Sequence, residues 1–254
     1  MKFSFLGTGT SSGVPMIACD CYVCTSKDPR DKRLRTAGLL EKGNTRVVFD
    51  TGPDFRQQIL RSGIKELQAV VFTHSHKDHI AGMDDIRAFN FFMKQDMNIY
   101  GTSITLDRVK IEFSYIFEAA DYPGVPRVQI HEIDENPFRI GDIDLTPIPV
   151  LHKEMEVYGF RSGNFAYVTD ANYISPESME KLRGLDVLVL NALRWQKHYS
   201  HFTLDEAIEI IEELRPQKAY LTHISHQLAT HEKLLEYLPK GIEPAYDGLE
   251  IEVF

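Results

Sequence analysis

The sequence predicts a single α/β domain. Apolar runs of strand length alternate with segments of helical periodicity, and no repeat, low-complexity tract or flexible linker divides the chain. In addition, five of the apolar runs end at or beside a histidine or an aspartate. A chain of 254 residues is long enough for one large domain with a sizeable core. We therefore expect one domain over residues 1–254, with its chemistry at the ends of strands.

Composition and charge limit the classes of protein to which the chain can belong. Hydrophobic residues make up 43% and charged residues 26%, as in an ordinary soluble globular protein. No apolar run approaches the ~20 residues that cross a bilayer, and the apolar start is too short for a signal peptide. We therefore expect a cytoplasmic protein without membrane contact. The net charge of −9 argues against a broad nucleic-acid surface.

The chain begins with a strand at residues 3–6 and a glycine-rich stretch at 7–13. This stretch is not a dinucleotide-binding fingerprint, because its third glycine comes one place too late and no strand–helix–acid pattern follows. Two interpretations stay open. It is either a plain turn from strand to loop, or a backbone whose amides hold substrate oxygens.

Turn residues, apolar periodicity and capping patterns place the elements that follow. In the first helix, Phe55, Ile59 and Leu60 are spaced to reach the core from one side. Thr203 and Glu206 form the pattern of a capping box. The expected segments are a charged surface loop at 26–35, strands at 39–40 and 45–49 around a turn at 42–44, a helix at 54–62, a buried strand at 67–72, helices at 84–93 and 106–119, a loop at 123–126, a strand at 185–190, an irregular segment at 191–202 and a helix at 203–214.

The stretch after the buried strand is the richest in chemistry. His74, His76, Asp78 and His79 stand within six positions. Imidazole and carboxylate are suited to borderline divalent metals such as zinc, iron or manganese. In an extended loop, positions i and i+2 point the same way, so His74 and His76 can hold one ion. Asp78 and His79 are offset and can face a second ion. The four residues after His79 suggest a turn into a helix.

All three cysteines of the chain stand within one hexapeptide, as Cys19, Cys21 and Cys24. An odd, clustered set does not suggest a disulfide framework. Three thiolates need one more ligand to close a tetrahedral zinc site, and His226 is the best candidate for it. The alternatives are three reduced thiols without metal and a surface role for His226.

Three later apolar runs also end in a residue able to bind a metal. These residues are His152, Asp170 and His223, in that order along the chain. A lone histidine at a strand end is usually structural, but three such residues in succession indicate a common site. Asp50 ends an earlier strand, where it either orients the loop of His74 or makes a simple turn.

The pattern His-x-His-x-Asp-His at residues 74–79 resembles the signature of the metallo-β-lactamase superfamily, whose members bind one or two metals between two sheets. The three later strand ends match what this resemblance requires. It implies two metal sites, with the following ligands: His74, His76 and His152 for one ion, Asp78, His79 and His223 for the other, and Asp170 as the bridge.

The cysteine spacing, this pattern and the stretches 222–227 and 246–251 together resemble the PhnP-type phosphodiesterases. The likeness runs from Leu6 to Val253 and is weak between Met93 and Phe138. It implies an αββα sandwich of a single domain and hydrolysis of 5-phosphoribosyl 1,2-cyclic phosphate or a cyclic nucleotide. The implied cofactors are two divalent ions, zinc or manganese, and one structural zinc near residues 19–24. Asp247-Gly248 suggests a hairpin turn.

The resemblance also assigns His201 to the leaving group and Asp78 to the catalytic centre, with His198 as the rival of His201. His201 stands just before the helix at 203–214, whose amides favour an anion. Several alternatives stay open: a thioester or lactone hydrolase, a nuclease that processes tRNA 3′ ends, an oxygenase like PqqB, and a non-catalytic metal-binding module. We expect a small phosphodiester as the substrate, no nucleic acid, and leave a homodimer open.

Overall fold

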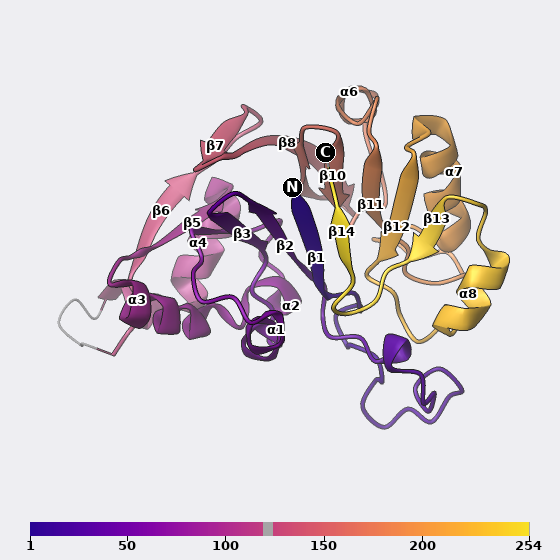
Figure 1. The fold of residues 1–254 in the computed structure, drawn as a ribbon, viewed down its shortest axis with the longest axis horizontal. Helices are drawn as coiled ribbons and strands as arrows, with labels where there is room; N and C mark the ends of the chain where they lie inside the picture. Colours follow the sequence, from indigo (N-terminus) through magenta and orange to yellow (C-terminus); the bar gives the residue numbers. More distant parts are fainter. Residues whose placement is uncertain (119–123, 254) are drawn as a thin grey trace.

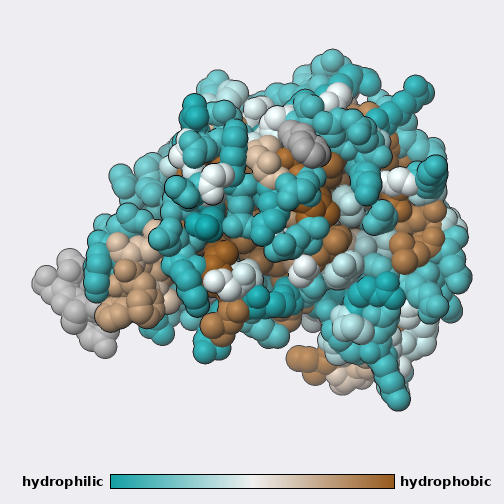
Figure 2. Space-filling model, in the orientation of Figure 1, coloured by the Kyte–Doolittle hydropathy of each residue, from teal (hydrophilic) through white to brown (hydrophobic). Residues whose placement is uncertain are grey.

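A computed structural model describes residues 1–118 and 124–253. Two sheets pack face to face, and helices cover the outer face of each (Figure 1). The predicted αββα sandwich is therefore confirmed. In the described part of the chain no helix is long and apolar enough to cross a membrane. The face seen in Figure 2 is covered mostly by hydrophilic residues.

The first sheet contains the amino-terminal half of the chain and the last strand. Its order is β14-β1-β2-β3-β4-β5-β6, antiparallel from β14 to β3 and parallel from β3 to β6. The predicted turn at 42–44 joins β2 to β3, with Lys42 paired to Thr45. The strands are β1 (Lys2–Gly7), β2 (Ala37–Lys42), β3 (Thr45–Phe49), β4 (Ala69–Val71), β5 (Met97–Gly101), β6 (Val128–Glu132) and β14 (Glu250–Glu252).

The second sheet has the order β13-β12-β11-β10-β9-β8-β7 and repeats this plan. It is antiparallel from β7 to β10 and parallel from β10 to β13. Because parallel strands end at the same edge of a sheet, residues that follow β10 and β12 come close together. The strands are β7 (Phe138–Ile140), β8 (Ile143–His152), β9 (Met155–Ser162), β10 (Phe165–Val168), β11 (Val187–Asn191), β12 (Lys218–Thr222) and β13 (Ile242–Pro244).

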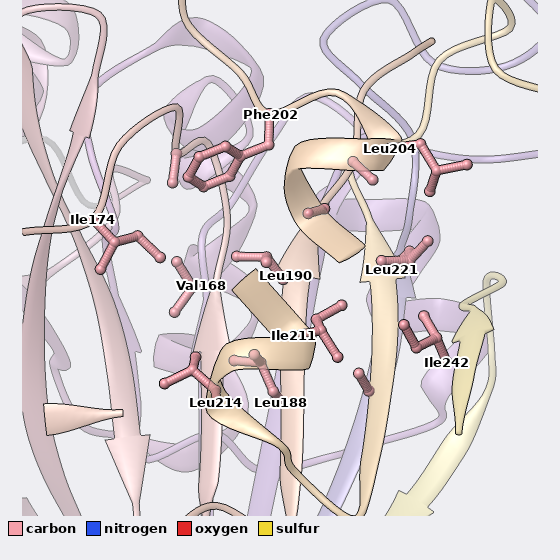
Figure 3. Packing of buried hydrophobic residues seen from close by; sticks show 14 of the residues in the cluster. Val168, Ile174, Leu188, Leu190, Phe202, Leu204, Ile211, Leu214, Leu221 and Ile242 are labelled. Atoms are coloured by element: carbon pink, nitrogen blue, oxygen red, sulfur yellow. The ribbon is translucent and has the colours of Figure 1, made fainter. Parts of the chain in front are cut away.

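Aromatic side chains fill the space between the sheets. The ring of Tyr167 lies 5.3 Å from that of Phe49 and 5.4 Å from that of Phe3, all fully buried. A separate aliphatic core joins the second sheet to the helix α7 (Leu204–Leu214), where Ile211 packs over the strands that carry Leu188 and Leu221 (Figure 3). Burying such side chains contributes about 1.5–3 kcal/mol each, so the strand ends rest on a rigid frame.

The helices cover the outer faces of the sheets. The capping box of α7 is present, since Thr203 and Glu206 each bind the other's backbone N–H. Short 3₁₀ turns occur at Pro29–Asp31 (η1) and Met83–Ile86 (η2). The α-helices are α1 (Phe55–Ser62), α2 (Lys77–Ile80), α3 (Arg87–Met93), α4 (Ser103–Glu112), α5 (Ser114–Glu118), α6 (Pro176–Lys181), α7 (Leu204–Leu214) and α8 (His231–Tyr237).

Two predictions about elements are wrong, the burial of Leu60 and the bounds of the helix predicted at 106–119. Leu60 is 64% exposed, because a residue five places after the buried Phe55 lies about 140° around the helix from it. The turn into a helix predicted after His79 is present, because residues 81–82 form a turn that leads into η2 and α3; only the short helix α2 before it was not predicted. The helix predicted at 106–119 starts at Ser103 and is divided into α4 and α5; the end predicted for it lies outside the described residues.

The segment at 26–35 is also not simply a surface loop. Arg33 is buried, and its Nη1 donates to Thr8 Oγ1 (2.9 Å) and to the carbonyl oxygen of Ala245 (2.5 Å). Burial lowers the pKa of Arg33 to about 10. In Figure 1 the loop from β1 to β2 lies at the lower right, beneath α8. Arg33 therefore ties this loop to the carboxyl-terminal part of the chain.

The hairpin predicted at Asp247-Gly248 is wrong as well. The strands on either side, β13 and β14, belong to different sheets. The carboxylate of Asp247 instead accepts hydrogen bonds from the backbone N–H groups of Thr8 (2.9 Å) and Leu34 (2.8 Å). The aspartate thus holds the amino-terminal loop in place while the chain crosses between sheets.

Candidate metal centre and its neighbouring cysteine cluster

The loop after β4 is fixed by one buried carboxylate. Asp50 accepts hydrogen bonds from Thr73 N (2.8 Å), Thr73 Oγ1 (2.8 Å) and His79 Nδ1 (2.7 Å). Because the threonine hydroxyl donates to Asp50, it must accept from Nδ1 of His74, 3.0 Å away. Both rings therefore keep Nε2 free. Of the two roles left open for Asp50, the structure shows the orienting one.

Close backbone contact supports the same loop. A Cβ atom on Gly52 would lie 2.1 Å from the carbonyl oxygen of Asp78, and one on Gly82 would lie 2.1 Å from the carbonyl oxygen of Gly52. Only glycine allows the chain after Asp50 to approach α2 so closely. The glycine after Asp50-Thr51 was the sequence signal for this contact.

Three histidines form the first group of potential ligands. Nitrogen atoms of His74, His76 and His152 all lie within 4.8 Å of one another. His152 donates from Nδ1 to the carbonyl oxygen of Ser200 (2.7 Å), which leaves Nε2 as the free nitrogen. His74 Nε2 is buried without a hydrogen-bond partner. His74 and His152 therefore each keep Nε2 free for a ligand, and His76 lies beside them.

Two carboxylates and two histidines form the second group, Asp78, His79, Asp170 and His223, within the same 4.8 Å limit. Oδ2 of Asp170 lies 3.3 Å from His79 Nε2 and 3.3 Å from His223 Nδ1. Asp78 Oδ2 lies 3.3 Å from the same His79 nitrogen. His223 uses its other nitrogen, Nε2, to meet the hydroxyl of Thr10 at 3.2 Å.

Asp170 joins the two groups, and His201 adjoins both. Atoms of His152, Asp170 and His201 form a third group within 4.8 Å. Nδ1 of His201 lies 3.7 Å from Asp170 Oδ1, and its ring stacks on that of His223 with centroids 4.7 Å apart. We call His74, His76, Asp78, His79, His152, Asp170, His201 and His223 the His/Asp cluster.

The charge balance of the His/Asp cluster favours a bound cation. Burial opposes protonation of His79, yet Asp170, Asp78 and Asp50 raise its pKa well above the usual value. Burial likewise opposes ionisation of Asp170, but His223 and His79 keep its pKa well below its usual range. His79 Nε2, His201 Nδ1 and His223 Nδ1 are buried without hydrogen-bond partners. Divalent metals fit both the negative charge and the free nitrogens.

The start of α7 is not the anion site that its position suggested. The N–H of Leu204 donates to the carbonyl oxygen of Arg194 (3.1 Å), and that of Glu206 donates to Thr203 Oγ1 (3.2 Å). These amides are therefore engaged within the protein. Sequence reasoning also missed Thr10 and the Ser200 carbonyl, because both act on histidines far along the chain.

The cysteines meet His226 in a second cluster. Nδ1 of His226 lies 3.3 Å from Cys19 Sγ and 3.4 Å from Cys21 Sγ, and Cys24 completes a group within 4.8 Å. All three thiols are free. Burial raises the pKa of the Cys21 thiol, but hydrogen bonds from the Cys24 backbone, His226 and Cys19 lower it overall, to about 6. Three sulfurs and one imidazole match a tetrahedral zinc site. We call these four residues the cysteine cluster.

One short segment connects both clusters. His223 and His226 stand three residues apart after β12 and belong to different clusters. Between them, Ile224 exchanges backbone hydrogen bonds with the glycine-rich stretch, through Thr8 O (2.9 Å) and Thr10 N (3.1 Å). These two hydrogen bonds hold the segment between His223 and His226 against the glycine-rich stretch.

Known proteins share this architecture. Residues 45–224 match the family described as the Beta-lactamase superfamily domain. A solved structure described as a new diphosphatase from the PhnP family is 42% identical, with a TM-score of 0.93 over 100% of this chain and 98% of that one. Zinc-bound PqqB from Methylobacterium extorquens superposes with a TM-score of 0.81 over 100% of both chains at 19% identity, which shows a shared fold.

A longer relative also matches. A protein from Porphyromonas gingivalis named octanoyltransferase is 38% identical over 253 residues. The match covers 98% of this chain but 51% of that protein, so the chain spans about half the length of this relative. The superfamily fold, the His/Asp cluster and the PhnP-family likeness over the full chain agree. The chain thus belongs to the PhnP family of the metallo-β-lactamase superfamily.

Proposed function

We propose that the protein hydrolyses a small cyclic phosphodiester, with 5-phosphoribosyl 1,2-cyclic phosphate as the leading substrate. The observation that carries this proposal is the position of Asp170. One carboxylate oxygen faces two histidines of the second group, and the other faces His201. A bridge with a proton donor on one side is the arrangement that in-line displacement at phosphorus needs.

In this proposal two divalent ions, zinc or manganese, occupy the His/Asp cluster. His74, His76 and His152 hold one ion, and the other ligands are Asp78, His79 and His223, with Asp170 between the two. When bound, such a pair supplies a water molecule of lowered pKa and neutralises the phosphate oxygens. The protein supplies fixed ligand orientation, because Asp50, Thr73, Thr10 and the Ser200 carbonyl hold the ring nitrogens that face away.

His201 is proposed as the residue that protonates the leaving oxygen. It is 8% exposed and lies at one side of the His/Asp cluster, next to Asp170 and His223. His198 is the rival, with its ring 5.2 Å from that of His201. His201 shares a group of potential metal ligands with Asp170, and among the described residues His198 belongs to no such group. The position of His201 therefore favours it over His198.

The cysteine cluster is proposed to hold a structural zinc. Its sulfurs lie in the loop that Arg33 and Asp247 bind to the carboxyl-terminal segment. Val14 and Val23 pack against Cys24 in a small apolar core of the same loop. A core this small gives little stability by itself, and a metal would hold the loop beside His226.

A second candidate is hydrolysis of a diphosphate. The observation in its favour is the 42% identical structure described as a diphosphatase. In both reactions a water molecule attacks phosphorus and an oxygen leaving group departs, so the same residues can serve either reaction. They differ in the leaving group, which is an alkoxide for the cyclic ester and a phosphate for the diphosphate.

A turnover panel on the purified, metal-loaded protein tests this proposal. The panel contains 5-phosphoribosyl 1,2-cyclic phosphate, 2′,3′- and 3′,5′-cyclic nucleotides, a nucleoside diphosphate ester, pre-tRNA, a lactone and an octanoyl thioester. We expect the highest kcat/KM for the ribosyl cyclic phosphate. A preference for the diphosphate would favour the second candidate, and exclusive turnover of the thioester or lactone would contradict both.

A further inference from the structure

A fully buried hydroxyl lies between the two sheets, and the proposed chemistry does not use it. It belongs to Tyr167, which lies on β10, three residues before Asp170. A phenylalanine at this position would fill the same space without burying a polar atom. The other fully buried aromatic side chains of this core are phenylalanines, namely Phe3, Phe5, Phe49, Phe160 and Phe165. Packing alone therefore does not account for the hydroxyl.

The hydroxyl of Tyr167 has no hydrogen-bond partner among the described residues. A buried hydroxyl without a partner is destabilising, because it has lost its hydrogen bonds to bulk water and gained none in return. Buried polar groups that no protein atom satisfies commonly bind an ordered water molecule. Such a water typically makes about three hydrogen bonds, so a site for it needs further polar groups near the hydroxyl.

Two carboxylates of the metal centre lie in the surroundings of this hydroxyl. The ring of Tyr167 stacks on that of Phe49, the residue before Asp50, with centroids 5.3 Å apart. On the other side, β10 leads directly to Asp170. Burial raises the pKa of Tyr167 well above its usual value, and the charges of Asp50 and Asp170 raise it further. The phenol therefore stays protonated and is a hydrogen-bond donor beside two acceptors.

Both carboxylates can accept one more hydrogen bond. A carboxylate has about four lone-pair sites. Asp50 uses three of them, for Thr73 N, Thr73 Oγ1 and His79 Nδ1. Asp170 accepts from Thr169 Oγ1 (2.6 Å), and as the bridge between two ions it uses two more sites. Each carboxylate thus keeps one site, and a water molecule has two protons to donate.

We propose that Tyr167 holds a buried water molecule behind the metal centre, and that this water donates to the carboxylates of Asp50 and Asp170. The water accepts the hydrogen bond of the Tyr167 hydroxyl, so all three groups are satisfied. Asp50 follows β3 of the first sheet, and Asp170 follows β10 of the second (Figure 1). The water therefore fixes the two halves of the His/Asp cluster relative to each other, and Tyr167 is a positioning residue. This inference rests on the proposed function for the two ions.

High-resolution crystallography of the wild-type protein tests the water directly. We expect a water within about 3.2 Å of the Tyr167 hydroxyl oxygen and of one oxygen each of Asp50 and Asp170. In Tyr167→Phe this water should be lost. A hydroxyl that contacts a protein group instead, a hydroxyl without any water, or a water that stays in place in Tyr167→Phe would overturn the proposal.

Metal affinity tests the positioning role, with Tyr220→Phe as the matched control. Tyr220 lies in the same core and stands level with Tyr167, because both pair with Val189. The charges that act on its hydroxyl are instead those of Lys218 and Glu243. In competition with a chelator, Tyr167→Phe should bind metal about 10-fold more weakly than wild type, because the carboxylates lose an orienting donor. Tyr220→Phe should bind as wild type does. Wild-type affinity in Tyr167→Phe, or equal losses in both variants, would overturn the positioning role.

A spectroscopic readout separates positioning from packing. In protein loaded with cobalt(II), the d–d absorption bands report the geometry of the ligands around the metal. Tyr167→Phe should shift these bands, whereas Tyr220→Phe should leave them unchanged. Wild-type bands in Tyr167→Phe would mean that the hydroxyl serves the fold alone, which contradicts the proposal.

These measurements use no substrate, so they separate this inference from the proposed function. If the wild-type protein holds two ions and the water but hydrolyses no phosphodiester, the proposed function fails while the positioning role stands. If it hydrolyses a phosphodiester and Tyr167→Phe keeps wild-type metal affinity and cobalt bands, the positioning role fails while the proposed function stands.

Discussion

The His/Asp cluster and the cysteine cluster are built in opposite ways. The first takes its residues from the ends of strands in both sheets, and most of them are buried. The second takes three residues from one hexapeptide, of which only Cys24 is buried, and one residue from a distant loop. The first therefore depends on the whole fold. The second fastens one loop to that fold.

The backbone shows the same difference. Asp50, Asp170 and His223 have φ values of 66°, 58° and 55°, in the left-handed region that non-glycine residues rarely adopt. Each such residue costs roughly 1–3 kcal/mol and persists only where the surrounding structure holds it. Beside the cysteine cluster only Ala18 has such an angle among the described non-glycine residues of that loop (φ 61°). Strain is thus concentrated where the chemistry is proposed.

Loss of a carboxylate ligand of the His/Asp cluster should have the largest effect on turnover. Asp170→Ala or Asp78→Ala should lower kcat/KM for a phosphodiester roughly 10⁴-fold, because both carboxylates balance the charge of the ions. Steady-state turnover and metal analysis measure the effect, with Asp107→Ala as the exposed control. Near-normal turnover with one metal bound in either variant would rule out the two-metal mechanism.

His201→Ala should have the next largest effect. A positioned general acid contributes about 10²- to 10⁴-fold to rate, so an alkyl phosphodiester should be hydrolysed that much more slowly while metal content stays the same. An ester of nitrophenol needs little protonation and should lose far less. Turnover of both esters by His201→Ala measures the effect, and His198→Ala, the variant of the rival residue, is compared with it. Equal losses on both would mean that His201 holds the phosphate or the fold.

The sequence predicted the ligands of both clusters but not the groups that orient the histidines, and the reason is physical. The spacing of the cysteines is local, and the strand-end histidines follow from apolar runs, so both could be found without a structure. The hydrogen bonds from His152 to Ser200 and from His223 to Thr10 connect residues 48 and 213 positions apart. No local spacing encodes such pairs.

The errors have the same origin. The sequence around Asp247 is typical of a hairpin turn. The strand before it, β13, belongs to the second sheet, however, and the strand after it, β14, belongs to the first. Similarly, the amides at the start of α7 look free until the fold brings the carbonyl oxygen of Arg194 to one of them. Sheet membership and the use of helix ends are decided by tertiary pairing, which the pattern of one segment does not contain.

Asp50→Asn tests how much the orientation of the ligands contributes to metal binding. This variant keeps every ligand of the His/Asp cluster but weakens the hydrogen bonds that orient them. An amide cannot accept all three hydrogen bonds that Asp50 receives from Thr73 and His79 in the same way as a carboxylate. Groups that orient ligands typically contribute about 10- to 100-fold to metal affinity or activity. We expect a loss of this size in metal affinity, measured by competition with a chelator. Wild-type affinity would mean that Asp50 serves the loop alone.

Cys21→Ser should have the smallest effect on turnover and a large one on stability. The variant should lose the proposed structural zinc, and loss of a metal is among the changes that cost more than about 4 kcal/mol. For a domain of this size that is roughly 10 °C in thermal midpoint. At a temperature where the variant is folded, kcat should stay within about threefold of wild type, because no cysteine belongs to the His/Asp cluster.

Tyr22→Phe is the matched control for this last variant, since Tyr22 lies in the same hexapeptide, is 56% exposed and offers no thiol. Calorimetry and zinc analysis under reducing conditions, together with turnover below the transition, distinguish the outcomes. Retention of zinc and of the wild-type midpoint would remove the structural role. A loss in kcat as large as that of His201→Ala would have a different meaning. The segment between His223 and His226 would then transmit changes at the cysteine cluster to the catalytic histidine, and the two clusters would act as one site.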